Sequence, residues 1–319
     1  MPLDPQAKAL LELMAASGAP PLGAGSVADA RQGIAAFAQL GGEPEPVAHI
    51  EDRQIPSPDQ AIPVRIYTPE GRGPFPVLVY FHGGGWVLCN LDTHDPLCRS
   101  LANAAECVVV SVDYRLAPEH KFPAAAEDCY AATQWVMNNA ASINGDAHRV
   151  AIGGDSAGGN LSAVVALMAR DRGAQAPVFQ LLIYPATEHY LADYPSSREN
   201  ADGYFLTRDD MEWFWNHYLN NEAETDNPYA SPLRAASLIG LPAALVITAE
   251  FDPLRDEGEF YAARLQESGV ATRLVRYDGM IHGFLSMAGV LAQGREGIGL
   301  AAGGLRSAFG AKPDSGEAD

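Results

Sequence analysis

The stretch "VAIGGDSAGGN", residues 150–160, passes from an apolar, partly β-branched run into a cluster of small residues around Ser156. The run predicts a strand, and the segment "AGGNLSAVVALMARD" that continues from it predicts a helix. A serine between the two, with Gly154 and Gly158 on either side, fits the G-x-S-x-G turn, on which a strained backbone exposes a nucleophilic hydroxyl. Glycine makes up 31 of the 319 residues, so the spacing also arises by chance in an ordinary tight turn. The rest of the sequence has to distinguish the two readings.

Short β-rich runs alternate with helical stretches from residue 63 onward, and several runs are apolar throughout. Such runs are typical of strands that helices cover on both faces. We therefore expect an α/β fold with a mostly parallel, doubly wound sheet. The expected strands are "PVRIYTP", "PFPVLVYFH", "CVVVSVDYR", "RVAIGGD", "FQLLIYP", "AALVITAEF" and "TRLVRYD". Further helices are expected at about 123–139, at 254–268 and after Leu285.

Two segments do not follow this alternation. Residues 1 to about 45 precede any expected strand, and they begin with a helix that has Asp4 as N-cap and Pro5 at its first position. Residues 186–235 interrupt the sheet, and a helix is expected to start there near Thr207, with Asp210 in an imperfect capping box. The two segments are either decoration or parts of a lid.

A second glycine cluster, "YFHGGGWV", follows the apolar run "PFPVLV". Consecutive glycines leave backbone N–H groups unobstructed, and a loop of this type after an early strand forms the other half of an oxyanion hole. We expect Gly84 and Gly85 to donate their N–H groups together with Ala157, which follows the serine. His82 and Gly83 are expected to shape the loop. A flexible surface turn is the alternative, but it does not explain why the glycines end an apolar strand.

Chain order provides a test, because in this type of fold the catalytic residues run serine, acid, histidine. Of the eight histidines, only His282 follows the run "AALVITAEF", and it lies in the loop after "TRLVRY". The acid is expected where the preceding strand ends, in "ITAEFDPLRDEG". Asp252 comes directly after that strand and is our choice, with Glu250 as the alternative. Asp252 could also act as the N-cap of a helix that has Pro253 at its first position.

Composition restricts the class of partner. The net charge of −19, from 40 acidic and 21 basic residues, is expected to repel nucleic acid and anionic membrane surfaces. The start, "MPLDPQAKALLELMAAS", lacks the basic region of a signal peptide. The four cysteines form no CxxC pair and show no metal-ligand spacing, which favours reduced thiols. We therefore expect a cytoplasmic protein that binds neither nucleic acid nor membrane.

Five segments in order, "HGGGW", "DYRLAPEHKFPAAAEDC", "GDSAGGNL", "DPLRDEG" and "DGMIHGF", together resemble the bacterial hormone-sensitive-lipase family of α/β-hydrolase carboxylesterases. The resemblance runs from about residue 60 to 290. It implies an α/β-hydrolase fold and a catalytic triad of Ser156, Asp252 and His282.

The resemblance also implies a division of the chain. Residues 1–45 and the insertion 186–235 are expected to form a helical cap. Residues 46–185 and 236–312 are expected to form the catalytic domain, and 313–319 a polar tail.

The expected activity is hydrolysis of carboxylic esters through an acyl-enzyme, which requires no metal and no cofactor. Nine of the 27 aromatic residues lie between 184 and 218, and an apolar cap over Ser156 would admit short-to-medium acyl chains. An amidase or lactonase with the same triad is the alternative. A receptor-like protein without enzymatic activity is disfavoured, because the plant hormone receptors that resemble this family lack the histidine that His282 supplies here. We expect a monomer or a homodimer.

Overall fold

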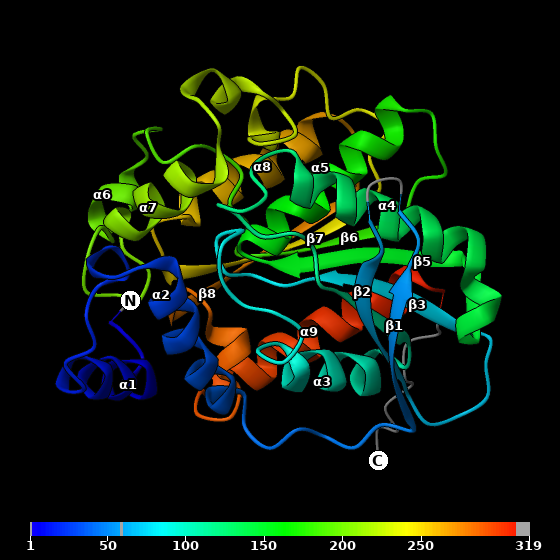
Figure 1. The fold of residues 1–319 in the computed structure, drawn as a ribbon, viewed down its shortest axis with the longest axis horizontal. Helices are drawn as coiled ribbons and strands as arrows, with labels where there is room; N and C mark the ends of the chain where they lie inside the picture. Colours follow the sequence, from blue (N-terminus) through cyan, green and yellow to red (C-terminus); the bar gives the residue numbers. More distant parts are fainter. Residues whose placement is uncertain (1, 58–59, 311–319) are drawn as a thin grey trace, which may run out of the picture.

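The computed structural model of the chain describes residues 2–57 and 60–310. Within these residues, eight strands form one sheet in the order β1-β2-β4-β3-β5-β6-β7-β8 (Figure 1). β1 pairs antiparallel with β2, and β2 with β4, whereas the other neighbours are parallel. The strands are β1 (His49–Ile55), β2 (Ile62–Thr68), β3 (Phe75–Phe81), β4 (Val108–Val112), β5 (Gly145–Asp155), β6 (Phe179–Ile183), β7 (Ala243–Phe251) and β8 (Thr272–Ile281).

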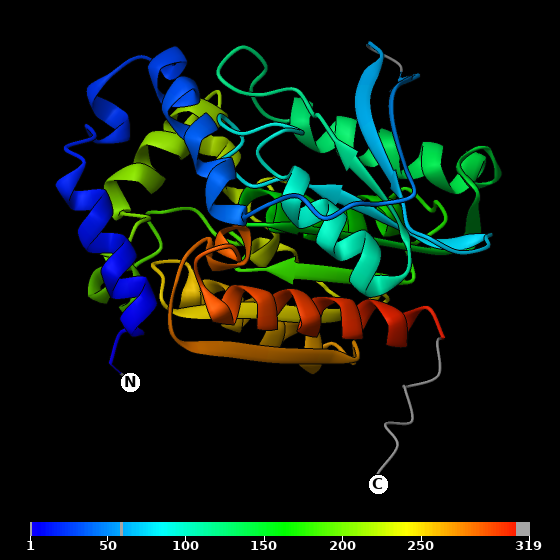
Figure 2. The ribbon, with the colours of Figure 1, turned by 90° about the horizontal axis from the view of Figure 1, so that it is seen from below.

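Helices cover both faces of the sheet, with α3 and α9 on one side and α4, α5 and α8 on the other (Figures 1 and 2). These helices are α3 (Asp95–Ala105), α4 (Ala124–Asn139), α5 (Ala157–Asp171), α8 (Arg255–Glu267) and α9 (Ala292–Ala308). The strands serve two cores at once: Val77 and Val79 of β3 are buried in one hydrophobic cluster, and Leu78 and Tyr80 in the other. This is why the central strands are apolar throughout. The predicted doubly wound α/β fold is confirmed.

Among the strands and the helices that cover the sheet, β1 and α3 are missing from the prediction. β1 lies at the edge of the sheet, and Ile55 is the one residue of this strand that is buried. Its sequence, "HIEDRQI", is therefore mostly charged or polar, and no apolar run marks it. α3 crosses from β3 to β4 with a stripe of buried residues and an otherwise polar surface.

The remaining α-helices gather at one end of the sheet (Figures 1 and 2). From the N-terminal segment come α1 (Pro5–Ala16), α2 (Val27–Ile34) and the 3-10 helices η1 (Leu22–Ala24) and η2 (Ala35–Gly41). From the insertion come α6 (Pro195–Glu199) and α7 (Arg208–Tyr218). The predicted helix starts are confirmed: Asp4 accepts the N–H groups of the first turn of α1, and Thr207 and Asp210 form a capping box. The tail 313–319 lies outside the described residues.

Arg31 of α2 fastens the N-terminal segment to the rest of the chain. Its guanidinium donates to the carbonyl oxygens of Val87 and Ala117, both at 2.9 Å, and forms a two-pronged ion pair with Glu119. The hydrogen bonds from Arg31 lower the pKa of Glu119 to about 2. A planar guanidinium fits such a set of acceptors in a way that an ammonium group cannot.

Candidate active site

Ser156 occupies the turn between β5 and α5. Its φ is 56° and its ψ is −117°, so a residue with a side chain is held at a positive φ, which costs about 1–3 kcal/mol. The N–H of Ser156 donates to the carbonyl oxygen of Ile183 at 2.9 Å. Two residues later, a Cβ built on Gly158 would lie 1.9 Å from the carbonyl oxygen of Phe81. The turn brings helix and strand so close that this position accepts only glycine.

Ser156, His282 and Asp252 lie together, although they come from three separate loops. Nε2 of His282 is 3.0 Å from Oγ of Ser156, and Nδ1 of His282 is 2.7 Å from Oδ2 of Asp252. Asp252 is fully buried and His282 is 6% exposed. An ionised carboxylate only accepts hydrogen bonds, so Nδ1 carries the proton and Nε2 is left to accept one from the serine. This arrangement can deprotonate Ser156 as it attacks an electrophile.

The glycine loop lies across from the serine. Gly84 and Gly85 line the same cavity as Ser156 and His282. Both have a positive φ, 104° and 59°, and a Cβ on Gly85 would overlap the ring of Phe214. Within the described part of the chain, their N–H groups meet no hydrogen-bond acceptor. Ala157 begins α5, where backbone N–H groups have no partner inside the helix.

Neither His82 nor Gly83 lines this cavity. His82 is fully buried, its Nδ1 lies 2.7 Å from the carbonyl oxygen of Gly83, and its ring stacks on Tyr114. Burial and the neighbouring His94 lower the pKa of His82 to about 3, so the imidazole is neutral and Nδ1 donates to Gly83. Both residues thus hold the conformation of the loop.

Asp155 is a residue of the site that the sequence analysis did not identify. Its buried carboxylate accepts the hydroxyl of Tyr80 at 2.7 Å and the N–H of Gly83 at 3.1 Å, and lies 3.2 Å from Nε2 of His94. Burial alone would raise the pKa of Asp155, but His94 and Tyr80 hold it below its usual value. The carboxylate next to the serine therefore anchors the glycine loop. The sequence signal that could have identified Asp155 is its position directly before Ser156, in "GDS".

The loop that carries Asp252 differs from the expectation at one point. α8 begins at Arg255 with Leu254 as its N-cap residue, so the suggested N-cap role of Asp252, with Pro253 at the first helical position, is wrong. Oδ1 of Asp252 instead accepts the N–H of Leu254 at 2.8 Å, in the turn before the helix. The alternative acid, Glu250, accepts the N–H of Gly279 at 2.7 Å.

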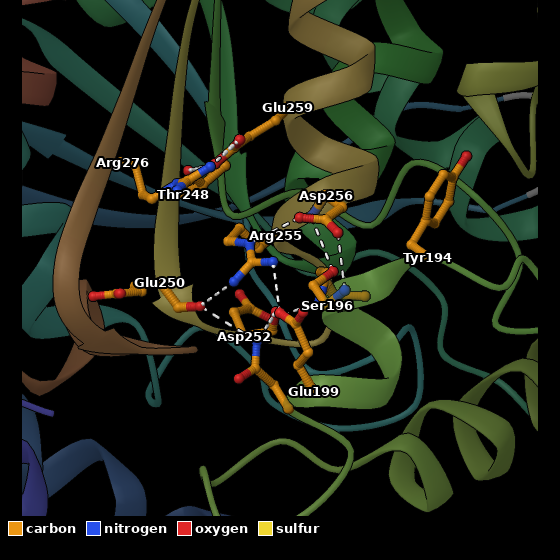
Figure 3. Close-up of polar contacts among 12 residues, drawn as sticks. Tyr194, Ser196, Glu199, Thr248, Glu250, Asp252, Arg255, Asp256, Glu259 and Arg276 are labelled. Carbon is orange, nitrogen blue, oxygen red and sulfur yellow. Dashed lines mark hydrogen bonds and ion pairs between the residues drawn. The ribbon is translucent and has the colours of Figure 1, made fainter. Parts of the chain in front are cut away.

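α6 of the insertion holds this loop in place (Figure 3). The buried amide of Asn200 donates to the carbonyl oxygens of Asp252 and Glu250, at 3.1 and 3.3 Å. Ser196, also buried, donates its hydroxyl to the carbonyl oxygen of Pro253 at 2.9 Å, and its N–H donates to Asp256 at 2.8 Å. These contacts were not foreseen, because polar residues in a loop-like stretch give no pattern that reveals them.

The cavity in front of Ser156 has a volume of about 160 Å³. Apolar side chains of both helical segments line it: Leu22, Ile34 and Phe37 from the N-terminal segment, and Phe205, Leu206 and Phe214 from the insertion. The N-terminal segment and the insertion therefore form a wall of the same pocket.

Among the described residues, no group of three or more His, Cys, Asp or Glu side chains is arranged to hold a metal ion. In the same part of the chain, none of the helices combines the length and the apolar character needed to cross a membrane.

Comparison with known proteins finds a family model, a curated relative and solved structures that are all α/β hydrolases or esterases. A family model described as the alpha/beta hydrolase fold matches residues 78–286. Carboxylesterase NlhH of Mycobacterium tuberculosis is 46% identical over 278 residues, which cover 85% of this chain and 87% of that protein. An esterase from the archaeon Pyrobaculum calidifontis has a TM-score of 0.92 at 44% identity, over 96% of this chain and 99% of that one.

A further similar structure is an ester hydrolase from the metagenome of Lake Arreo, complexed with a derivative of bipyridine phosphonate. Its TM-score is 0.93 at 44% identity, and the match covers 97% of this chain and 99% of that one. Fold, sequence and family model thus agree over most of the chain. The chain belongs to the α/β-hydrolase family, among the carboxylesterases related to hormone-sensitive lipase.

Proposed function

We propose that this carboxylesterase hydrolyses esters of short-to-medium acyl chains through Ser156, His282 and Asp252. The observation that carries the proposal is the hydrogen-bonded series from Oγ of Ser156 through both ring nitrogens of His282 to Asp252. Ser156 lines a small apolar cavity. Serine, base and orienting acid in this order are the elements of nucleophilic acyl transfer.

In the first half of the reaction, Oγ of Ser156 attacks the ester carbonyl carbon, and Nε2 of His282 takes the hydroxyl proton. The tetrahedral intermediate collapses when the same nitrogen returns that proton to the departing alkoxide, which leaves as the alcohol. The acyl group stays on Ser156. Asp252 stabilises the imidazolium that forms between these two proton transfers.

In the second half, a water molecule takes the place of the alcohol. His282 removes its proton as the oxygen attacks the acyl carbon, and then returns the proton to Oγ of Ser156. The acid leaves and the enzyme is regenerated, so the cycle requires no metal and no cofactor.

The N–H groups of Gly84, Gly85 and Ala157 are the proposed oxyanion hole. Removing one donor of this kind from other hydrolases costs about 3 kcal/mol of transition-state stabilisation. The support here is that the N–H groups of Gly84 and Gly85 meet no acceptor in the described residues and line the cavity with Ser156.

The proposed chain-length preference rests on the size of the cavity. A volume of about 160 Å³ is smaller than the roughly 300–1,000 Å³ of sites that enclose drug-sized ligands. We propose that the segments 1–45 and 186–235 act together as the cap that closes this space. A closed cap admits a short chain and offers no open apolar surface for an oil interface.

The test compares the wild type with Ser156→Ala on a panel of p-nitrophenyl esters, amides and lactones. We expect the variant to fold as the wild type does, to lose ester hydrolysis and to escape labelling by a fluorophosphonate. An active Ser156→Ala enzyme would disprove the assignment of the nucleophile. Faster turnover of amides or lactones than of esters would favour the alternative activities, and faster turnover of emulsified long-chain triglycerides than of butyrate would contradict the chain-length preference.

We also propose that the protein acts in the cytoplasm, as a monomer or a homodimer. All four cysteines are free thiols, and burial raises the pKa of Cys107 to about 12, so that this thiol stays protonated. Reduced, unpaired thiols fit a reducing compartment. Fractionation of the producing cells, and light scattering of the purified protein, test both statements.

A further inference from the structure

A second apolar cavity lies next to the catalytic one. It has a volume of about 610 Å³, against about 160 Å³ for the cavity that contains Ser156. Side chains of α1, α2 and η2 form most of its lining. Four residues line both cavities and so lie between them: Leu22, Ile34, Phe37 and Phe205.

Two of these four residues form a stacked pair of rings. The ring centroids of Phe37 and Phe205 are 5.2 Å apart and the ring planes differ by 11°. The pair lies over the backbone next to His282: a Cβ on Gly283 would be 3.4 Å from Cε1 of Phe205 and 3.7 Å from Cζ of Phe37. The rings therefore lie directly beside the catalytic base, with one ring from each helical segment.

Phe205 is held in an unusual conformation. Its φ is 76°, a region that bulky residues rarely occupy because the backbone is strained there. The surrounding structure thus holds Phe205 in this unfavourable backbone conformation, with its ring between the two cavities. Strain of this kind is concentrated at sites that bind or react.

The chemistry of the outer cavity suits a hydrocarbon chain. Leu10, Met14 and Leu40 line it, and Leu13 is 69% exposed on α1. One of its few polar groups, the carboxylate of Asp29, is engaged by Ser26 in the capping box of α2. Its described lining contains no lysine or arginine, so an anionic headgroup finds no counter-charge there.

We propose that the Phe37–Phe205 pair is the wall that limits chain length, and that the outer cavity takes the part of an ester's alkyl chain that passes this wall. The proposal rests on the proposed function, because it explains the short-chain preference by one pair of rings. A chain that moved the rings apart would gain the apolar surface beyond them, worth roughly fourfold in kcat/KM for each methylene buried.

The experiment measures kcat/KM for monomeric p-nitrophenyl butyrate and laurate with Phe37→Ala and with Phe205→Ala. In either variant we expect the laurate-to-butyrate ratio to rise at least about tenfold over the wild type. A second pair of substrates, dodecyl acetate and butyl acetate, shows which part of the ester enters the outer cavity. A rise in the dodecyl-to-butyl ratio of kcat/KM assigns the outer cavity to the alcohol chain, and a rise in the laurate-to-butyrate ratio assigns it to the acyl chain. Two variants are used because either one alone could disturb folding.

Phe260→Ala is the matched control, because it breaks another aromatic pair, that of Phe260 with Tyr194, which lies outside both cavities. The double variant with Phe37→Ala and Gly33→Leu tests whether filling the outer cavity reverses the long-chain gain. Gly33 lines the outer cavity but not the catalytic cavity. A Cβ at this position would meet no atom within 4 Å, so a leucine side chain can occupy part of the outer cavity.

We expect Phe260→Ala to keep the wild-type ratio and Gly33→Leu to remove most of the long-chain gain. A wild type that already prefers laurate would overturn the proposed chain-length preference itself. A wild type that prefers butyrate, with unchanged ratios in the folded Phe37→Ala and Phe205→Ala variants on both ester series, would overturn only the role of the ring pair. A gain that Gly33→Leu leaves intact would show that the chain does not enter the outer cavity.

Discussion

Replacing Asp252 by asparagine should stop catalysis without disturbing the fold. In the wild type, Oδ1 of Asp252 accepts the N–H of Leu254 at 2.8 Å, and Oδ2 accepts Nδ1–H of His282 at 2.7 Å. Asparagine has only one oxygen. If that oxygen keeps the bond to Leu254, the amide N–H₂ faces Nδ1, and the imidazole must carry its proton on Nε2. That tautomer donates to Ser156 and cannot take its proton.

The size of the effect follows from these contacts. A flipped amide would restore the tautomer, but it would leave the buried N–H of Leu254 without an acceptor, at a cost of about 1–3 kcal/mol. The imidazolium formed during the reaction also loses its only buried counter-charge among the described contacts of His282. We expect kcat to fall about 10⁴-fold, as it does when this substitution is made in other Ser-His-Asp enzymes. That loss corresponds to about 5.5 kcal/mol of activation free energy.

The assay is p-nitrophenyl butyrate hydrolysis by Asp252→Asn, with Glu250→Gln as the matched control. Glu250→Gln removes a carboxylate two residues before Asp252, at the end of β7, but that carboxylate accepts the N–H of Gly279, so we expect a loss of less than about tenfold. Thermal unfolding of both variants checks that the fold is intact. An Asp252→Asn enzyme that kept more than about a tenth of the wild-type kcat, or a larger loss in Glu250→Gln, would refute this reasoning.

Two further predictions concern the stability of the fold. The ion pair with Arg31 lowers the pKa of Glu119 from 4.5 to about 2, so its contribution to stability is complete above about pH 4.5 and is lost as the pH falls toward 2. The difference in unfolding free energy between wild type and Glu119→Gln, measured in urea, should shrink over that range. Gly158→Ala should destabilise by about 3 kcal/mol or more, because its Cβ would meet a carbonyl oxygen, whereas Gly303→Ala, on α9 with open space around it, should stabilise by about 0.5–1 kcal/mol in the same assay.

The residues brought together around Ser156 could be located from the sequence because each carries a local signature. The turn at Ser156 requires small residues within two positions, and the glycine loop requires consecutive glycines after a strand. His282 and Asp252 were found by chain order, which follows from the order of the strands in this type of fold. Steric and topological requirements of this kind determine the residue types at a few neighbouring positions, so a short sequence motif reveals them.

The supporting contacts could not be found in this way, because their partners are distant and chemically ordinary. Asn200 donates to backbone carbonyl groups about 50 residues away, and every residue carries such a group. The stacking of Phe37 on Phe205 joins two segments that the pattern of strands and helices does not relate. β1 was missed because an edge strand with one buried residue keeps too little apolar character to be recognised.

The hydrogen bonds from α6 to the loop of Asp252 have a consequence for how such enzymes diverge and recombine. A chimera that exchanged residues 186–235 as a block would also remove Ser196 and Asn200, which donate to the carbonyl groups around the acid. These two donors lie in residues 186–200 of the block, whereas the side chains of the block that line the catalytic cavity, Phe205, Leu206 and Phe214, all come after Asn200. A crossover placed just after Asn200 would therefore transfer a relative's substrate range while the recipient kept its own support for the acid.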